Sequence, residues 1–306
     1  MSLTSFLDIK DVNDKVKPLR PKLPRKIDAV LRVEPRSNRY TLVGTAFDYL
    51  LRFEIQRRAP HAVARRWIAE TGADMIWRET GTAGVGMELF WGAEPDHYLP
   101  PEEIARRARA IVEKAKAAVA AFCKSANPND AMRIELATHA IRLAKLDSIC
   151  RAQRLDPRFE EADPEDAQDI VDMLAFVPFD EFLDNRILLL NPDFGETSRL
   201  VGGADADLIS GDLLVDIKVT KKGDVNVKNL DQLLGYFLLG RRQRHVDKTF
   251  PDLKRVAIYF GRHGYLWVLD VTTWTEHPEF SEIEEWFFKR AKEVFEASGT
   301  STSGTI

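Results

Sequence analysis

Two short apolar runs in the C-terminal half of the chain carry charged side chains at a spacing suited to phosphate chemistry. Asp205 and Asp207 belong to the first run, and Asp216 and Lys218 belong to the second. Carboxylate oxygens are the ligands that hard divalent ions prefer, and such an ion can activate water for attack on a phosphodiester. The two runs therefore predict a site that holds Mg²⁺ beside a phosphate group.

Both runs alternate as β-strands do, because side chains two residues apart share a face of a strand. In the run 213–220 one face is wholly apolar, and the other carries Asp216 and Lys218. In the run 204–209, Asp205 and Asp207 share a face. We expect two strands, each with one buried face and one face that carries the charged groups.

The turn between the runs decides whether the charged faces coincide. A two-residue loop keeps them on one surface, whereas a three-residue loop without a bulge would separate them. Gly211 can supply the positive φ of a tight hairpin, which favours the shorter loop. If the loop begins at Gly211, Asp207 lies across from Asp216; if it ends there, Asp205 does.

An Asp-x-Lys sequence on a strand is commonly a solvated face, and this alternative applies to the second run taken alone. The neighbouring run favours chemistry, because Asp205 and Asp207 would repel Asp216 unless a cation lay between them. Lys218 offsets part of that repulsion. A metal site accounts for the cluster better than an ordinary surface does.

The order of these residues resembles the PD-(D/E)XK nuclease superfamily, and within it the RecB-like and lambda-exonuclease-like branch. That pattern is an aspartate on one strand, (Asp/Glu)-x-Lys on the next and Gln-x-x-x-Tyr on the following helix. In this chain it falls on Asp207, Asp216-Ile217-Lys218, Gln232 and Tyr236. The resemblance implies an α/β (α+β) fold with a restriction-endonuclease-like core, in which helices flank a mixed central β-sheet.

The same branch has a Gly-x-x-x-His sequence on an upstream helix. Here Gly44 is followed by Asp48 in place of the histidine. A carboxylate at this position could also ligate a metal or orient a metal-bound water. The alternative is an ion pair between Asp48 and Arg52, which are four residues apart on a helix.

The resemblance also implies roles for the individual residues. Asp207 and Asp216 would ligate Mg²⁺ or Mn²⁺ near the main-chain carbonyl of Ile217, with Asp205 as the rival first-strand ligand. Lys218 would hold or activate the attacking water and balance charge. Gln232 and Tyr236, one helical turn apart, would support Lys218 and contact the nucleic acid.

These roles imply metal-dependent hydrolysis of DNA, with RNA as an alternative substrate. Some members of the branch carry four cysteines around an iron–sulfur cluster. This chain has Cys123 and Cys150 alone, so no such cluster is expected. Two other function classes stay open: a non-catalytic nucleic-acid-binding or scaffold protein on the same fold, and a metal-dependent hydrolase of a small phosphorylated substrate.

The net charge of −4 argues at first against a nucleic-acid partner, but its distribution matters more. The segment from Lys218 to Lys248 contains eight lysines and arginines and three aspartates, an excess of five positive charges. We expect five of them to contact nucleic acid: Lys221, Lys222, Lys228, Arg241 and Arg242. The alternative is that these are solvated loop and helix ends.

Composition bounds the remaining classes. The 306 residues are 44% hydrophobic, which is enough for a substantial core, and no stretch is long enough for a transmembrane helix. The N-terminus has no apolar signal region, and two cysteines form no disulfide framework. We expect a cytoplasmic protein with no membrane partner.

Four segments are expected along the chain. Residues 1–60 form a basic arm, extended and rich in proline up to residue 39, and then a first core helix. Residues 61–190 form a mainly helical insertion or lobe, with packed tryptophans at 67, 77 and 91 and a solvated acidic helix from Asp163. Residues 191–297 form the nuclease core, in which the helix of Gln232 ends at Gly240. Residues 298–306 form a disordered tail.

Overall fold

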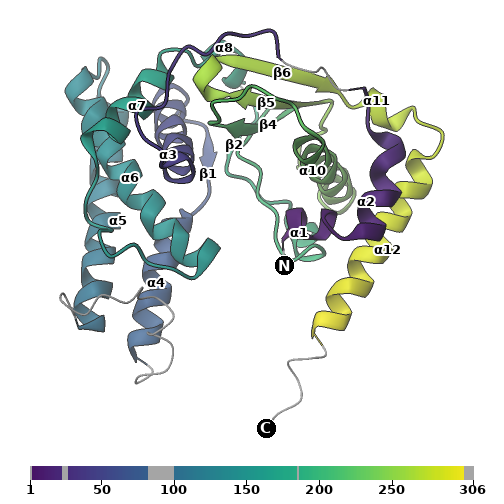
Figure 1. Cartoon of the computed structure of the whole chain (residues 1–306), viewed down its shortest axis with the longest axis horizontal. Helices are drawn as coiled ribbons and strands as arrows, with labels where there is room; N and C mark the ends of the chain where they lie inside the picture. Colours follow the sequence, from purple (N-terminus) through teal and green to yellow (C-terminus); the bar gives the residue numbers. More distant parts are fainter. Residues whose placement is uncertain (1, 23–26, 82–99, 185, 300–306) are drawn as a thin grey trace.

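The computed structural model describes residues 2–22, 27–81, 100–184 and 186–299 (Figure 1). Its centre is a six-stranded mixed sheet with the strand order β1-β2-β3-β4-β5-β6. The strands are β1 (Val63–Ala64), β2 (Leu188–Leu190), β3 (Leu208–Ser210), β4 (Leu213–Lys218), β5 (Arg255–Phe260) and β6 (Tyr265–Asp270). β1 is parallel to β2 and β4 to β5, and the other pairs are antiparallel. The chain is thus a mixed α/β protein, as predicted.

The β3–β4 hairpin has a two-residue loop that begins at Gly211, one of the two expected arrangements. Ser210 pairs with Leu213 and Leu208 with Val215. Gly211 has φ +60°, as the first residue of a tight hairpin loop requires. The register places Asp207, one residue before β3, across from Asp216.

Both faces of the sheet are covered, so the face of β4 that carries Asp216 and Lys218 is also buried over most of its length. The side chains of Leu213 and Val215 enter one apolar cluster, and Leu214 enters a second cluster on the opposite face. Side chains 213–216 are buried, and those of Ile217 and Lys218 are half-buried. The charged groups reach solvent at the carboxyl end of the strand, where the covering helices stop.

Helices cover the two faces from opposite sides (Figure 1). On one side α3 (Tyr40–Arg58) packs against a helical lobe, although residues 61–190, which were expected to form that lobe, also contribute β1 and β2 to the sheet. The helical lobe consists of α4 (Ile68–Gly81), α5 (Pro101–Lys124), α6 (Asp130–Ala152) and α7 (Pro164–Leu174), followed by the short α8 (Phe179–Phe182). Trp67 is buried there, while the Trp77 side chain and Trp91 lie outside the described part.

The other face is covered by α10 (Val227–Val246), which contacts β5 and the short α9 (Glu196–Arg199), while α12 (Phe280–Gly299) and α11 (Thr272–Thr275) pack in the same apolar cluster farther from the sheet. α10 does not end at Gly240, as had been expected, but continues for six residues. A Cβ at Gly240 would lie 2.7 Å from Leu253 Cδ1, so this glycine allows a close helix contact rather than a helix end. α12 extends to Gly299, and residues 300–306 of the expected disordered tail lie outside the described residues.

Residues 3–19 are largely helical, so the expectation of an extended arm is wrong for this part, whereas the described residues between 20 and 39 form no helix or strand. Residues 3–19 form α1 (Leu3–Leu7), α2 (Lys10–Val16) and η1 (Lys17–Leu19), and Ser2 and Ser5 form a capping box. The apolar side chains of these helices are buried against α10 and α12. Three of the basic residues form ion pairs within the chain: Lys10 with Asp14, Lys15 with Glu282 and Arg20 with Asp231.

The expectation that α7 is solvated is wrong for two of its acids. Asp166 and Asp169 are fully buried, because arginines from other segments neutralise them. Arg39 Nε lies 2.7 Å from Asp166, and Arg262 donates two hydrogen bonds of 2.8 Å to Asp169. These pairs tie α7 to the segment before α3 and to η4 (Gly261–His263), between β5 and β6. Within the described residues no helix is both long and apolar enough to cross a bilayer.

Candidate active site

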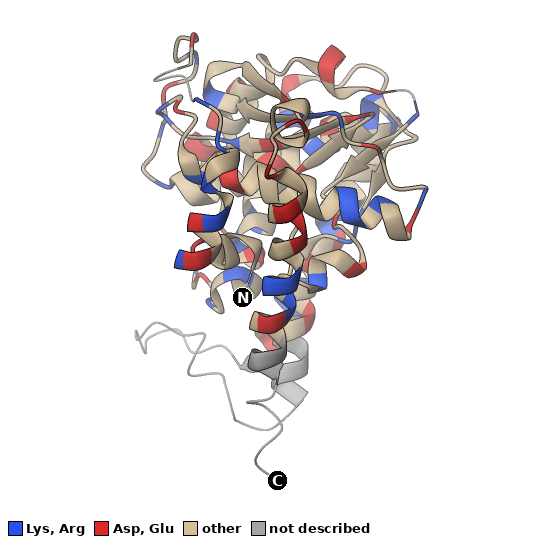
Figure 2. Cartoon of the chain, turned by 90° about the vertical axis from the view of Figure 1, so that its right-hand side faces the viewer, with Lys and Arg blue, Asp and Glu red and all other residues tan. Residues whose placement is uncertain are grey.

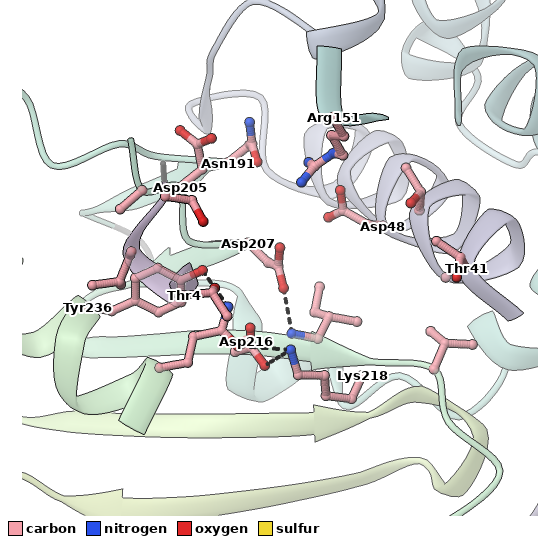
Figure 3. A pocket seen from close by; sticks show the side chains of 18 of the residues that line it. Thr4, Thr41, Asp48, Arg151, Asn191, Asp205, Asp207, Asp216, Lys218 and Tyr236 are labelled. Atoms are coloured by element: carbon pink, nitrogen blue, oxygen red, sulfur yellow. Dashed lines mark hydrogen bonds and ion pairs between the residues drawn. The ribbon is translucent and has the colours of Figure 1, made fainter. Parts of the chain in front are cut away.

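A pocket of about 630 Å³ lies at the carboxyl end of β4, between α3, α6 and the first turns of α10 (Figure 3). The predicted metal ligands and catalytic residues all line it, although they come from distant parts of the chain. They are Asp48, Asp205, Asp207, Asp216, Ile217, Lys218, Gln232 and Tyr236.

The hairpin fixes the two aspartates of the predicted pattern. Asp207 Oδ2 accepts a hydrogen bond of 2.6 Å from the backbone N–H of Ile217, which holds this carboxylate against β4. Asp216 is 3% exposed, and its Oδ2 lies 2.9 Å from Lys218 Nζ. Burial raises the pKa of Asp216 to about 6; Lys218 opposes this rise and Asp207 adds to it.

A chain of hydrogen bonds fixes Lys218 from the opposite side. Lys218 Nζ donates to Gln232 Oε1 at 3.1 Å, and Gln232 Nε2 donates to Tyr236 OH at 2.8 Å. A capping box at Asn226 starts α10, so Gln232 and Tyr236 stand one turn apart on the face toward the site. The Tyr236 ring stacks on Phe194 at 5.6 Å, which holds the phenol in place.

Lys218 stays charged in this setting. Burial by itself lowers the pKa of Lys218, but the neighbouring Asp216 and, more weakly, Asp207 raise it above its ordinary value. The group is therefore an ammonium, which donates hydrogen bonds and balances negative charge. It is not a free amine that could accept a proton at neutral pH.

Asp48 forms the expected ion pair and also lines the pocket. Arg52 Nη2 lies 2.5 Å from Asp48 Oδ2, which is the expected ion pair, while Oδ1 is buried and has no hydrogen-bond partner in the described structure. In Figure 3 the carboxylate points toward Asp207 across the pocket. Burial raises the pKa of Asp48 to about 7; Arg52 lowers it and Asp207 raises it further.

Asp205, the rival first-strand ligand, lies at the rim of the same pocket. Its side chain is 42% exposed and stands 3.6 Å from Arg65, and its backbone forms an isolated bridge with Asp193. Burial raises its pKa, and Arg65 opposes the rise. Asp205 thus has a cationic partner of its own, whereas Asp207 faces the carboxylate of Asp216.

The donor groups suit a hard divalent ion. Asp48 Oδ1 is a buried oxygen without a hydrogen bond, Asp216 Oδ2 has Lys218 as its ion-pair partner, and Asp207 adds a third carboxylate to the same pocket. An all-oxygen set of this kind matches Mg²⁺ or Mn²⁺. Among the described residues no three acidic, histidine or cysteine side chains already stand as a preassembled metal site. The carboxylates share a pocket, and their oxygens would have to move closer to one another to bind an ion.

The predicted nucleic-acid contacts do not gather around this pocket. Lys221 pairs with Glu34 at 2.9 Å and Lys228 with Asp8 at 3.1 Å. Lys221 and Lys222 line a second pocket of about 440 Å³, which shares Tyr40, Lys218 and Thr220 with the first.

Arg241 and Arg242 lie beside α12 and line neither pocket. Arg241 pairs with Glu284 at 3.0 Å, and the guanidinium of Arg242 lies 4.5 Å from the centroid of the Phe288 ring. On the side of the molecule where α12 lies, basic and acidic segments are interspersed (Figure 2). The positive charge that clusters in the sequence is thus dispersed and largely neutralised in space.

Several residues that line the pocket had not been predicted. Thr41 and Thr45 lie on the same face of α3 as Asp48, a helical spacing that could have identified them. Arg151 from α6, Asn191, and Ser2 and Thr4 from the N-terminus also line it. No local sequence pattern connects these residues with the hairpin, because tertiary packing alone brings them there.

Comparison with protein-family models, curated proteins and solved structures gave no match.

Proposed function

We propose that this protein is a nuclease that depends on Mg²⁺ or Mn²⁺ and hydrolyses phosphodiester bonds, with DNA as its substrate. The observation that carries the proposal is the convergence of Asp207 and Asp216 beside a charged Lys218 that Gln232 holds in place. A surface ion pair needs neither the second aspartate nor the glutamine. An ion held against a phosphate needs both acids and an adjacent cation.

The sheet topology supports the same proposal. An antiparallel hairpin, β3–β4, is followed by a crossover helix, α10, and a strand parallel to β4. A mixed central sheet flanked by helices is what the resemblance implies for a restriction-endonuclease-like core, and here Asp207, Asp216 and Gln232 lie on adjoining elements. The helical lobe is then an addition that forms one wall of the pocket.

Each residue has a definite task in the proposed reaction. Asp207, Asp216 and Asp48 would hold the ion, which when bound polarises the phosphate and lowers the pKa of water. Lys218, as an ammonium, donates a hydrogen bond to the attacking water or to a phosphate oxygen. Gln232 orients Lys218, and Tyr236 orients Gln232.

A direct test incubates the protein with linear and circular, single- and double-stranded DNA, and with RNA, in Mg²⁺, Mn²⁺ or EDTA. We expect cleavage of DNA with either ion and none in EDTA. Asp216→Ala and Lys218→Ala should each lower the rate by at least about 100-fold, because one removes a metal ligand and the other the cation beside it.

Asp212→Ala is a matched control, since Asp212 is partly exposed in the hairpin loop and pairs with Arg255 outside the pocket. This variant should cleave at the wild-type rate, and circular dichroism should show all three variants folded. If the wild-type protein cuts neither DNA nor RNA with any divalent ion, the proposal is wrong. Salt-sensitive DNA binding without cleavage would instead favour a non-catalytic nucleic-acid-binding protein.

A further inference from the structure

A cation from the helical lobe stands over the pocket and belongs to none of the predicted motifs. Arg151 lies in the last turn of α6 and lines the pocket. In Figure 3 its side chain points from α6 toward Asp48 and Asp207, from the wall opposite Lys218. The acidic cluster therefore lies between two cations from different parts of the fold.

The buried carboxylate of Asp147 helps to orient the Arg151 side chain. Asp147, one turn earlier on α6, is 2% exposed, and its Oδ1 accepts a hydrogen bond of 2.7 Å from Tyr49 OH. The Tyr49 hydroxyl in turn accepts a hydrogen bond of 3.2 Å from the backbone N–H of Ala69. Asp147 Oδ2 lies 3.7 Å from Arg151 Nε, beyond hydrogen-bond distance. The guanidinium is thus directed toward the pocket without being tightly bound.

The carboxylates of the site stabilise the charged form of Arg151. Burial lowers its pKa, but the carboxylates of Asp147, Asp207, Asp48 and Asp205 together raise it. A cation that served only to neutralise these acids would be expected to form a short contact, as Arg52 does with Asp48 at 2.5 Å. The Arg151 side chain instead stays 58% exposed, with its donors available to a ligand.

We propose that Arg151 is a phosphate-binding residue that the helical lobe contributes to the site. It contacts a non-bridging oxygen of the bound nucleic-acid strand from the wall opposite Lys218. The planar guanidinium has several donors and suits phosphate better than a point charge does. This inference rests on the proposed function and names a substrate contact of the same site.

The first experiment measures binding of a fluorescent single-stranded DNA as salt is varied, with Ca²⁺ present and again with EDTA. Arg151→Ala should weaken binding about 10-fold and should lower the slope of log K against log salt by about one, because one phosphate contact is lost. Arg151→Lys should recover the slope. Arg154→Ala is the matched control, since Arg154 is exposed and does not line the pocket, and it should change neither quantity.

A second experiment removes the charge from the DNA instead of the protein. One phosphate at a time is replaced by a neutral methylphosphonate. Replacement at one position should lower the affinity of the wild-type protein about 10-fold. The same replacement should leave the affinity of Arg151→Ala unchanged, because this variant already lacks the contact with that phosphate. Equal sensitivity of the two proteins at every position would overturn the inference.

The outcomes separate this inference from the proposed function. If the wild-type protein cleaves DNA with Mg²⁺ while Arg151→Ala keeps its salt slope and affinity, the arginine contact is wrong and the nuclease proposal stands. A change in thermal stability or Mn²⁺ affinity with an unchanged slope would likewise contradict the contact, since it would mark Arg151 as a structural neutraliser. Absence of any binding or cleavage by the wild type would overturn both.

Discussion

At the scale of single residues, the site concentrates negative charge where water has limited access. Asp216 and Asp48 are buried and face Asp207, so ionising them in the absence of a divalent ion is unfavourable. Lys218 and Arg52 offset this cost in part. On the proposed function, a bound divalent ion would offset the remainder of this cost.

This arrangement predicts that the metal-free protein loses stability as pH rises. The folded pKa of Asp48 is about 7, against about 3.9 for an unfolded aspartate. A raised folded pKa contributes stability that is complete below the unfolded pKa and is lost as pH rises through about 7. In EDTA, the free energy of unfolding of the wild type should therefore fall by at least about 1 kcal/mol more than that of Asp48→Asn between pH 5 and pH 8.

Urea unfolding followed by circular dichroism at several pH values measures this difference. Asp212→Asn, a change at a partly exposed aspartate of the hairpin loop, serves as the control and should follow the wild-type profile. Parallel profiles for the wild type and Asp48→Asn would contradict the prediction.

The hydrogen bonds from Lys218 to Tyr236 predict a graded series of activities. Gln232→Ala leaves Lys218 without its lateral acceptor, and Tyr236→Phe removes only the partner of Gln232. Initial rates of DNA cleavage should fall about 10- to 100-fold for Gln232→Ala, and less for Tyr236→Phe, since one net hydrogen bond is worth about 1 kcal/mol. A larger loss for Tyr236→Phe than for Gln232→Ala would show that the phenol acts directly on substrate.

At the scale of elements, the length of the β3–β4 loop decides whether the site exists. Two loop residues keep Asp207 across from Asp216, and a shift of one residue would turn one strand over. Gly211 is suited to the loop both by its positive φ and by its surroundings, because a Cβ would lie 2.8 Å from Asp184 Oδ2.

Inserting one glycine between Gly211 and Asp212 should abolish divalent-dependent cleavage, because Asp207 would no longer face Asp216. Asp212→Asn, which keeps the loop length, should retain the wild-type rate. Cleavage of a labelled DNA measures the activity, and thermal unfolding confirms that the insertion variant still folds. Undiminished activity of a folded insertion variant would mean that Asp207 is not the first-strand ligand.

At the scale of the whole molecule, a few buried ion pairs join the helical lobe to the sheet. The pair of Arg262 in η4 with Asp169 in α7 is fully buried and bidentate. α6 packs against α7 and α3. The Arg262–Asp169 ion pair therefore also helps to position Arg151 and Asp48 relative to the strands.

Asp169→Ala should therefore destabilise the protein by about 3–5 kcal/mol, because it leaves the Arg262 charge buried and uncompensated. Chemical denaturation measures this loss. Asp172→Ala is the matched control on the same helix; Asp172 is partly exposed and pairs with Arg36, so its removal should cost less than about 1 kcal/mol. Similar losses for the two variants would show that burial does not set the strength of the Arg262 pair.

The residue types and their spacing predicted the hairpin and the long helices, and the family resemblance added the predicted site residues that line the pocket. The alternation of side chains and the loop length fix which residues of two adjacent strands face each other, and both can be read locally. The helix that carries Gln232 and Tyr236 follows from its apolar spacing in the same way. Its continuation past Gly240 does not, because the glycine serves a contact with Leu253, which is distant in sequence.

Tertiary packing alone decided the rest. Whether a basic or acidic side chain is available to a ligand depends on its partner, and the partners of Arg241, Lys228 and Asp169 come from remote segments. The N-terminal helices are stable because they bury apolar side chains on α10 and α12, a surface that no local pattern reveals. Arg151 reaches the pocket for the same physical reason: packing between helices sets its position, and no spacing along the chain encodes it.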